Sequence, residues 1–226
     1  MSSRKIRLLL WCGCLGAVIL FAGDILFYGE WGSARVWSHD YFLSMMARVA
    51  AWRLHLGSIT GPVGMGCEIL GYVGIWFCCR RAAPRLAAVM LASQYANCLF
   101  SVLDHGIYGP LGFVIRNCGP DSSAVAQIFK LDGLLTNFEI VGWTWDLGSL
   151  IWIFLTLRGK SGVPRWTVML APFITYRVEK VAFWVPAPLG LPLWGGWTNF
   201  IAASWFAVVA LTYKDQGIES PIAERA

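Results

Sequence analysis

The chain has 226 residues, of which 57% are hydrophobic and only 14% are charged, and its mean hydropathy is +0.58. This composition excludes an ordinary soluble domain and a disordered chain, and it is typical of a polytopic membrane protein. The net charge of +5 does not indicate a nucleic-acid partner, because the basic residues cluster beside the apolar segments, where they act as a topology signal.

The apolar runs are long enough for membrane-spanning helices, which need about 20 residues each. The first run continues through Asp24 and lacks a small-residue cleavage site, so we interpret it as a span rather than a signal peptide. We predict a single all-α transmembrane domain over residues 1–213 and a polar, disordered tail over 214–226. The six predicted spans are residues 8–28, 59–79, 86–108, roughly 132–157, 165–185 and 193–213.

Two further segments are predicted to lie along the outer membrane surface. Residues 34–56 combine apolar side chains with Arg48, Arg53 and His55, a pattern that favours an amphipathic interfacial helix. Residues 122–131 form a similar, shorter element. In an alternative with seven spans, residues 34–56 also cross the membrane.

The orientation follows from the basic clusters at residues 4–7, 80–85 and 158–165 and from Lys214. Basic loops remain in the cytoplasm. We therefore expect a multi-pass protein with both termini cytoplasmic, in the endoplasmic reticulum if the source is eukaryotic and in the plasma membrane if it is bacterial.

A weak internal repeat is consistent with this topology. Asp24 and Asp104 are each followed, four residues later, by Tyr-Gly. Glu68 and Glu139 are each followed by two apolar residues, a glycine and an aromatic residue. The matches occur in the same order, as two parallel copies of a hairpin would produce. Coincidence is the alternative interpretation.

Polar side chains recur within the predicted spans. A charge at membrane depth costs about 2.5–3.5 kcal/mol unless it faces a partner or a wet cavity. For any single residue, a structural ion pair or an interhelical hydrogen bond is an equally good interpretation; for the whole set we favour one shared polar cavity in the outer half of the bundle. The acids in or beside the spans are Asp24, Glu68, Asp104, Asp132, Glu139, Asp146 and Glu179.

The nearby cations are too few to balance these acids. Arg177 and Lys180 lie three residues apart, in an expected ion-pair cluster with Glu179, and His105 follows Asp104. Some of the carboxyl groups are therefore expected to be neutral, and a neutral carboxylic acid in an apolar cavity is a potential proton donor. The candidate catalytic acids are Glu68, Glu139, Asp24, Asp104 and Asp146.

Aromatic residues form the second chemical signal. The chain contains 13 Trp, 13 Phe and 7 Tyr, and Trp76, Trp143 and Trp145 lie deeper than the interfacial belt where Trp usually collects. Aromatic faces stabilise cations by about 0.5–2 kcal/mol each. We predict that these three residues, with His105 and Asn199, contact a substrate or a developing cation. The spacing of the cysteines and histidines indicates no metal site, and we expect no metal and no cofactor.

Several short motifs lie along most of the chain. They are Pro164-Arg165-Trp166, Ala171-Pro172, Val185 to Gly190, Gly195 to Asn199, Gly23-Asp24-x-Leu26 and Asp104-His105. With these motifs the chain resembles a family of small bacterial and fungal membrane proteins of unknown function. A looser, architectural similarity is to the fungal membrane-bound terpene cyclases of meroterpenoid pathways, which implies a small helical bundle that acts through membrane-embedded carboxylates, with Glu68 in the position of an early one.

The resulting hypothesis is a metal-independent terpene cyclase or isomerase of terpenoid biosynthesis. Glu68 or Glu139 would protonate an epoxide or olefin of a prenylated lipid, and the aromatic side chains would stabilise the carbocation. Its partners would be the bilayer, a hydrophobic prenylated or terpenoid small molecule and pathway enzymes in the same membrane. The alternative is a non-catalytic membrane protein that binds a lipid or sterol, carries a solute or serves in an assembly.

Overall fold

The computed structural model describes residues 1–28, 31–135 and 138–214, except for the side chains of Tyr28, Asp104 and residues 131–141. The regular secondary structure in these ranges is entirely helical, which confirms the all-α part of the predicted fold class. The longer helices are α1 (Ser3–Tyr28), α3 (Ala51–Cys79), α4 (Pro84–Cys118), α6 (Phe138–Leu157) and α9 (Trp197–Thr212). The shorter ones are α2 (His39–Arg48), α5 (Ser123–Leu135), α7 (Pro172–Tyr176), α8 (Gly190–Gly195) and the 3₁₀ helices η1 (Ala34–Val36), η2 (Arg165–Leu170) and η3 (Glu179–Trp184).

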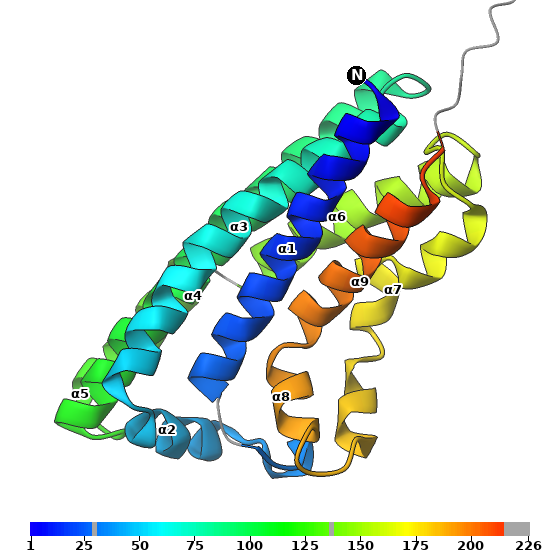
Figure 1. The fold of residues 1–226 in the computed structure, drawn as a ribbon. Coiled ribbons are helices and arrows are strands. Elements are labelled where there is room, and N and C mark those ends of the chain that lie inside the picture. The colour runs from blue at the N-terminus through cyan, green and yellow to red at the C-terminus, as the bar shows by residue number, and fades with distance from the viewer. Residues whose placement is uncertain (29–30, 136–137, 215–226) are drawn as a thin grey trace, which may run out of the picture.

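The helices form one elongated bundle (Figure 1). Helix α1 packs between α3 and α9, and α4 packs against both α3 and α6. Helix α2 lies across the end of the bundle opposite the N-terminus, whereas α9 ends beside the N-terminus (Figure 1). The two ends of the described chain therefore lie at the same end of the bundle.

Small residues bring α1 and α3 into close contact. A methyl group on Gly71 would lie 2.5 Å from the Cα atom of Gly13, and one on Gly16 would lie 2.5 Å from the carbonyl oxygen of Gly64. Glycines at such crossings let two backbones approach closely, which favours association in a membrane because dispersion contacts and packing replace the hydrophobic driving force. This contact fixes the two helices that carry Asp24 and Glu68.

Three of the described helices are long and apolar enough to cross a membrane. They are Ser3–Phe27, Ala51–Cys79 and Pro84–Cys118, and Trp197–Thr212 is a shorter apolar helix. On α1, the residues Leu8, Trp11, Leu15 and Val18 are 43–64% exposed and recur every three or four positions. An exposed apolar stripe along a helix of this length is the surface that lipid would cover.

The predicted fifth span, residues 165–185, is not one continuous helix. It consists of η2, α7 and η3. Ala171 has an extended backbone (ψ 138°) and Pro172 begins α7. A residue before proline is disfavoured in the helical region, and proline has no N–H for a continuing helix. The break therefore follows from the Ala-Pro dipeptide.

The predicted interfacial helix over residues 34–56 is not one continuous helix either. Helix α2 covers only His39–Arg48 and has 10 residues, too few to cross a bilayer. Val49 and Ala50 have extended backbones, with ψ 130° and 142°, and α3 then begins at Ala51. The apolar side of α2 packs into a cluster with Phe27, Leu54, Leu111 and Ile115. Its side chains in this cluster are Phe42, Leu43, Met45 and Met46.

The predicted fourth span, residues 132–157, is described as α5 up to Leu135 and as α6 from Phe138, and residues 136–137 lie outside the described residues. Asp132 lies in α5 and Asp146 in α6. The predicted outer element at 122–131 corresponds to α5, which begins at Ser123. Of the predicted tail, residues 215–226 lie outside the described residues.

Candidate functional site

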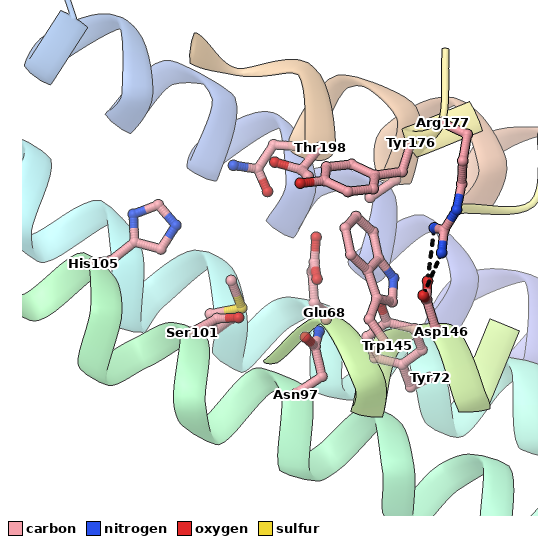
Figure 2. A pocket seen from close by; sticks show the side chains of 14 residues that line it. Glu68, Tyr72, Asn97, Ser101, His105, Trp145, Asp146, Tyr176, Arg177 and Thr198 are labelled. Atoms are coloured by element: carbon pink, nitrogen blue, oxygen red, sulfur yellow. Dashed lines mark hydrogen bonds and ion pairs between the residues drawn. The ribbon is translucent and has the colours of Figure 1, made fainter. Parts of the chain in front are cut away.

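A cavity of about 210 Å³ lies between α3, α4, α6, α9 and the end of α7 (Figure 2). The helices contribute side chains three or four residues apart, so that they project from one face. Asn97, Ser101 and His105 on α4 are an example. The lining residues are Met65, Glu68, Tyr72, Asn97, Ser101, His105, Gly142, Trp145, Asp146, Tyr176, Arg177, Thr198, Asn199 and Ala202.

Glu68 is the acid at the centre of this cavity. It lies near the middle of α3 and is 3% exposed. Figure 2 shows its carboxyl group between Asn97 and Thr198. Its Oε1 atom is buried and has no hydrogen-bond partner among the described residues. Because nearly all buried polar atoms in proteins are paired, this oxygen is suited to bind a ligand or to exchange a proton.

A second buried acid, Asp24, lies beside the cavity and joins three helices. The side-chain amide of Asn199 on α9 donates a 2.7 Å hydrogen bond to Asp24 Oδ2. The Nδ1 atom of His105 on α4 lies 4.0 Å from the other carboxylate oxygen, Oδ1. A methyl group on Gly61 of α3 would lie 2.6 Å from His105 Cβ. Glycine at position 61 therefore lets His105 pack directly against α3.

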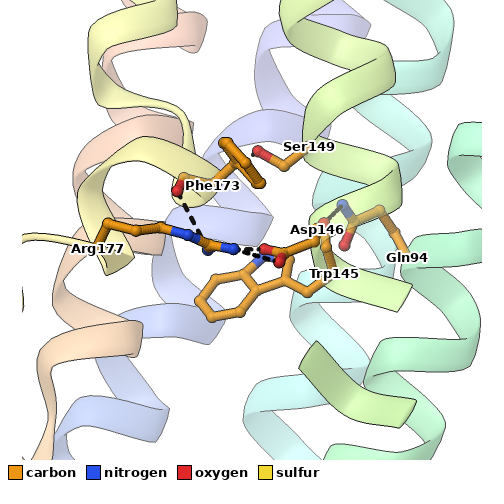
Figure 3. Close-up of polar contacts among 6 residues, drawn as sticks. All are labelled: Gln94, Trp145, Asp146, Ser149, Phe173 and Arg177. Atoms are coloured by element: carbon orange, nitrogen blue, oxygen red, sulfur yellow. Dashed lines mark hydrogen bonds and ion pairs between the residues drawn. The ribbon is translucent and has the colours of Figure 1, made fainter. Parts of the chain in front are cut away.

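An ion pair closes the opposite side of the cavity (Figure 3). The guanidinium of Arg177 donates to both carboxylate oxygens of Asp146, at 3.0 Å and 2.5 Å. It also donates to the carbonyl oxygen of Phe173 at 3.3 Å and lies 4.2 Å from the centre of that ring. The side chains are 47% and 31% exposed, so the pair contributes little to stability. It does commit Asp146 to the role of a hydrogen-bond acceptor.

Hydrogen bonds from neighbouring helices position α6 at this wall. Ser93 Oγ donates to the Thr144 carbonyl at 2.5 Å, and Gln94 Nε2 donates to the Trp145 carbonyl at 3.4 Å. Ser149 Oγ accepts a 2.9 Å hydrogen bond from the backbone N–H of Phe173. These contacts hold Trp145 in the cavity, where its ring lies 5.9 Å from that of Tyr176.

The structure thus brings together most of the described candidates. Glu68, His105, Trp145, Asp146 and Asn199 line one cavity. Asp24 does not line the cavity, but it contacts two residues that do, Asn199 and His105. Arg177 also lines the cavity, and it pairs with Asp146 rather than joining a cluster with Glu179 and Lys180. Glu179 begins η3 and Lys180 is exposed, because the helix that would have carried all three is interrupted.

Two predicted aromatic residues lie elsewhere. Trp143 is 74% exposed, since it precedes Trp145 by two residues and so points about 200° away around the helix. Trp76 lies one turn beyond Tyr72, and the guanidinium of Arg80 stacks 4.8 Å from its ring centre. Neither lines the cavity.

The side chains of Asp104 and Glu139 lie outside the described residues. The predicted repeat can therefore be followed only in its first copy, where Asp24 and Glu68 both lie at the candidate site. Whether the second copy repeats this arrangement stays a prediction.

Sequence reasoning did not include several lining residues in the site. They include Tyr72, Asn97, Ser101, Tyr176 and Thr198. The four-residue spacing of Asn97, Ser101 and His105 is the signal that identifies one polar helical face. No comparable pattern marks Tyr176, because it reaches the cavity from the interrupted segment.

These features define a helical protein with three described helices long and apolar enough to cross a membrane and with a polar cavity inside its bundle. The chain belongs to a family of unknown function, DUF6796, whose sequence profile matches residues 1–216. No curated protein and no solved structure matches the chain.

Proposed function

We propose that this protein is a membrane-embedded enzyme that cyclises or isomerises a prenylated or terpenoid lipid by protonating it. The observation that carries the proposal is the carboxyl group of Glu68, which is buried in the cavity and has no partner for Oε1 among the described residues. A buried charge without a compensating group is costly, so the neutral acid is the form suited to this position. A neutral carboxylic acid can donate a proton.

The other described acids have different surroundings. Both carboxylate oxygens of Asp146 accept hydrogen bonds from Arg177 in a bidentate ion pair, so they are already engaged. Asp24 accepts a hydrogen bond from Asn199 and is not part of the lining. Glu68 is therefore the acid that we assign to the first step, and Glu139 is the alternative donor.

Aromatic rings support the cationic part of the proposal. Tyr72, Trp145 and Tyr176 line the cavity with Glu68. The faces of such rings attract a positive charge, most strongly where water is excluded. We propose that they replace the set of Trp76, Trp143 and Trp145 as the groups that stabilise the carbocation.

The size of the cavity limits what enters it. At about 210 Å³, it is smaller than the 300–1,000 Å³ typical of drug-sized ligand sites. We propose that it encloses the reacting end of the lipid while the remainder lies between helices or in the bilayer. Enzymes that make or consume such a lipid would work in the same membrane.

We also propose six membrane crossings, with the fifth formed by η2, α7 and η3. Irregular backbone is tolerated at membrane depth where it lines a cavity, and Tyr176 and Arg177 line this one. Both termini would be cytoplasmic, in the endoplasmic reticulum or the bacterial plasma membrane, which fits their position at one end of the bundle (Figure 1).

Reporter fusions test this topology. A reporter before Met1 and another after Lys214 are expected to be active only in the cytoplasm, and a tag inserted at Ser122, between α4 and α5, only outside. Opposite locations for the two terminal reporters would contradict an even number of crossings.

Product analysis tests the enzymatic proposal. A host that expresses the chain would receive prenylated phenols and their epoxides, and its lipids would be profiled by mass spectrometry and chromatography. We expect a new product with the mass of its substrate, because protonation followed by proton loss leaves the formula unchanged.

The second candidate function is lipid binding without turnover. The many hydrogen-bonding groups of the lining, among them Asn97, Ser101 and Thr198, favour it because they suit a polar head group. No conversion across the panel, from protein shown to be folded and inserted, together with co-purification of a lipid, would support this function over the enzyme. A solute carrier or an assembly subunit would show neither result.

A further inference from the structure

We propose that His105 is the base that ends the reaction and that Asp24 and Asn199 position it. The inference rests on the proposed function and assigns a second proton-transfer group within the same cavity. An isomerisation that begins with proton donation ends with proton loss, and a second group in the cavity can accept that proton.

The first argument is the location of His105. It lines the same cavity as Glu68 but comes from α4 rather than α3. Figure 2 shows one nitrogen of its imidazole ring on the side of the cavity that Glu68 occupies. Donor and acceptor thus face one enclosed space from two separate helices, so that protonation and proton loss can take place at different atoms of the bound molecule.

The second argument concerns the tautomer. Nδ1 of His105 lies 4.0 Å from Asp24 Oδ1, and a carboxylate favours a proton on the ring nitrogen nearest to it. With the proton on Nδ1, the other nitrogen, Nε2, carries the lone pair and can act as a base. Asn199 holds the second oxygen of the same carboxylate at 2.7 Å, which fixes the orientation of Asp24.

The third argument is the choice among the lining residues. Asp146 already accepts two hydrogen bonds from Arg177. The amides and hydroxyls of Asn97, Ser101 and Thr198 are not bases near neutral pH. Among the lining residues other than Glu68 and Asp146, His105 is the one whose neutral side chain carries a ring nitrogen with a free lone pair.

Every proton and electron pair of the proposed reaction is accounted for. With an epoxide, the O–H bond of Glu68 breaks, the proton goes to the epoxide oxygen and a C–O bond breaks. The electron pair of an alkene then forms the new C–C bond and leaves a cation on carbon. A neighbouring C–H bond breaks, its electrons form a C=C bond and its proton goes to Nε2 of His105. Return of that proton to the Glu68 carboxylate restores the enzyme.

A spectroscopic experiment tests the positioning without requiring turnover. The full chain, labelled with ¹⁵N-histidine and held in lipid nanodiscs, gives NMR signals from three histidines. The signal that disappears in His105→Gln is the signal of His105. We expect the Nδ1–H tautomer for His105 and a shift toward Nε2–H in Asp24→Asn. An Nε2–H tautomer in the unaltered protein, or no change in Asp24→Asn, would overturn the assignment.

A product experiment tests the chemistry. In His105→Gln, the substrate should still be consumed, but the wild-type product should fall by about 100-fold per substrate consumed, the lower end of what a positioned base contributes. Other double-bond isomers and water adducts should replace it. His55→Gln is the matched control, because His55 packs against Phe113 with ring centres 4.8 Å apart and does not line the cavity.

The two proposals fail differently. A wild-type product ratio from His105→Gln would overturn the role of His105 and leave the acid-initiated reaction standing. No conversion by the unaltered protein across the panel would overturn both.

Discussion

Replacing Glu68 with glutamine is expected to lower product formation by about 10²–10⁴-fold, the contribution of a positioned acid. Glutamine has nearly the same shape but cannot donate a proton at neutral pH. Because Glu68 Oε1 has no hydrogen bond to any described residue, the substitution breaks no such contact. Insertion, yield and thermal stability should therefore remain close to those of the wild type. The measurement is the rate of product formation in membranes, normalised to folded protein.

Glu179→Gln is the matched control for this variant. It makes the same chemical change at a residue that does not line the cavity, so product formation should be unchanged. Full activity in Glu68→Gln would disprove the acid assignment. If Glu139→Gln then lost the activity, the proton donor would be Glu139.

The Gly71→Val variant is expected to lose stability through the contact between α1 and α3. Even the first added carbon would lie 2.5 Å from the Cα atom of Gly13 and under 3.0 Å from the ring of Phe206. Since one of these atoms is backbone, the helices must separate. Overpacking of this kind costs about 1–3 kcal/mol.

Thermal unfolding of detergent-purified protein measures the effect. Gly66→Val is the control, because a carbon added there on the same helix meets nothing within 4 Å. Gly71→Val should unfold at a clearly lower temperature than Gly66→Val. Equal unfolding temperatures would mean that this crossing is looser than the glycine contacts indicate.

Part of the candidate site was predictable from charge and hydropathy. Glu68 and Asp146 are acids within apolar segments, and the cost of burying a charge in lipid predicts that such residues face a shared interior. His105 and Asn199 were expected there for the same reason. Their exact partners were not predictable, because Asn199 and Asp24 are 175 residues apart along the chain.

Other expectations failed where local structure departed from a regular helix. The ion pair was placed among Arg177, Glu179 and Lys180 on the assumption of one continuous span. Helix α7 ends at Tyr176 and η3 begins at Glu179, which removed that geometry, and Arg177 instead reaches Asp146 on α6. Trp143 was included for its depth, but depth does not specify which side of a helix faces the cavity.

The amino-acid sequence by itself determined the class of this protein, because runs of about 20 apolar residues form helices in lipid wherever they occur. It also determined that polar groups such as Asp24 and Glu68 would be buried. Only the tertiary structure decided which of these groups meet. Helix rotation, the glycine contact of α1 with α3 and the break at Pro172 depend on packing between distant segments, and that packing leaves Glu68 without a described hydrogen-bond partner at Oε1 while it pairs Asp24 with Asn199.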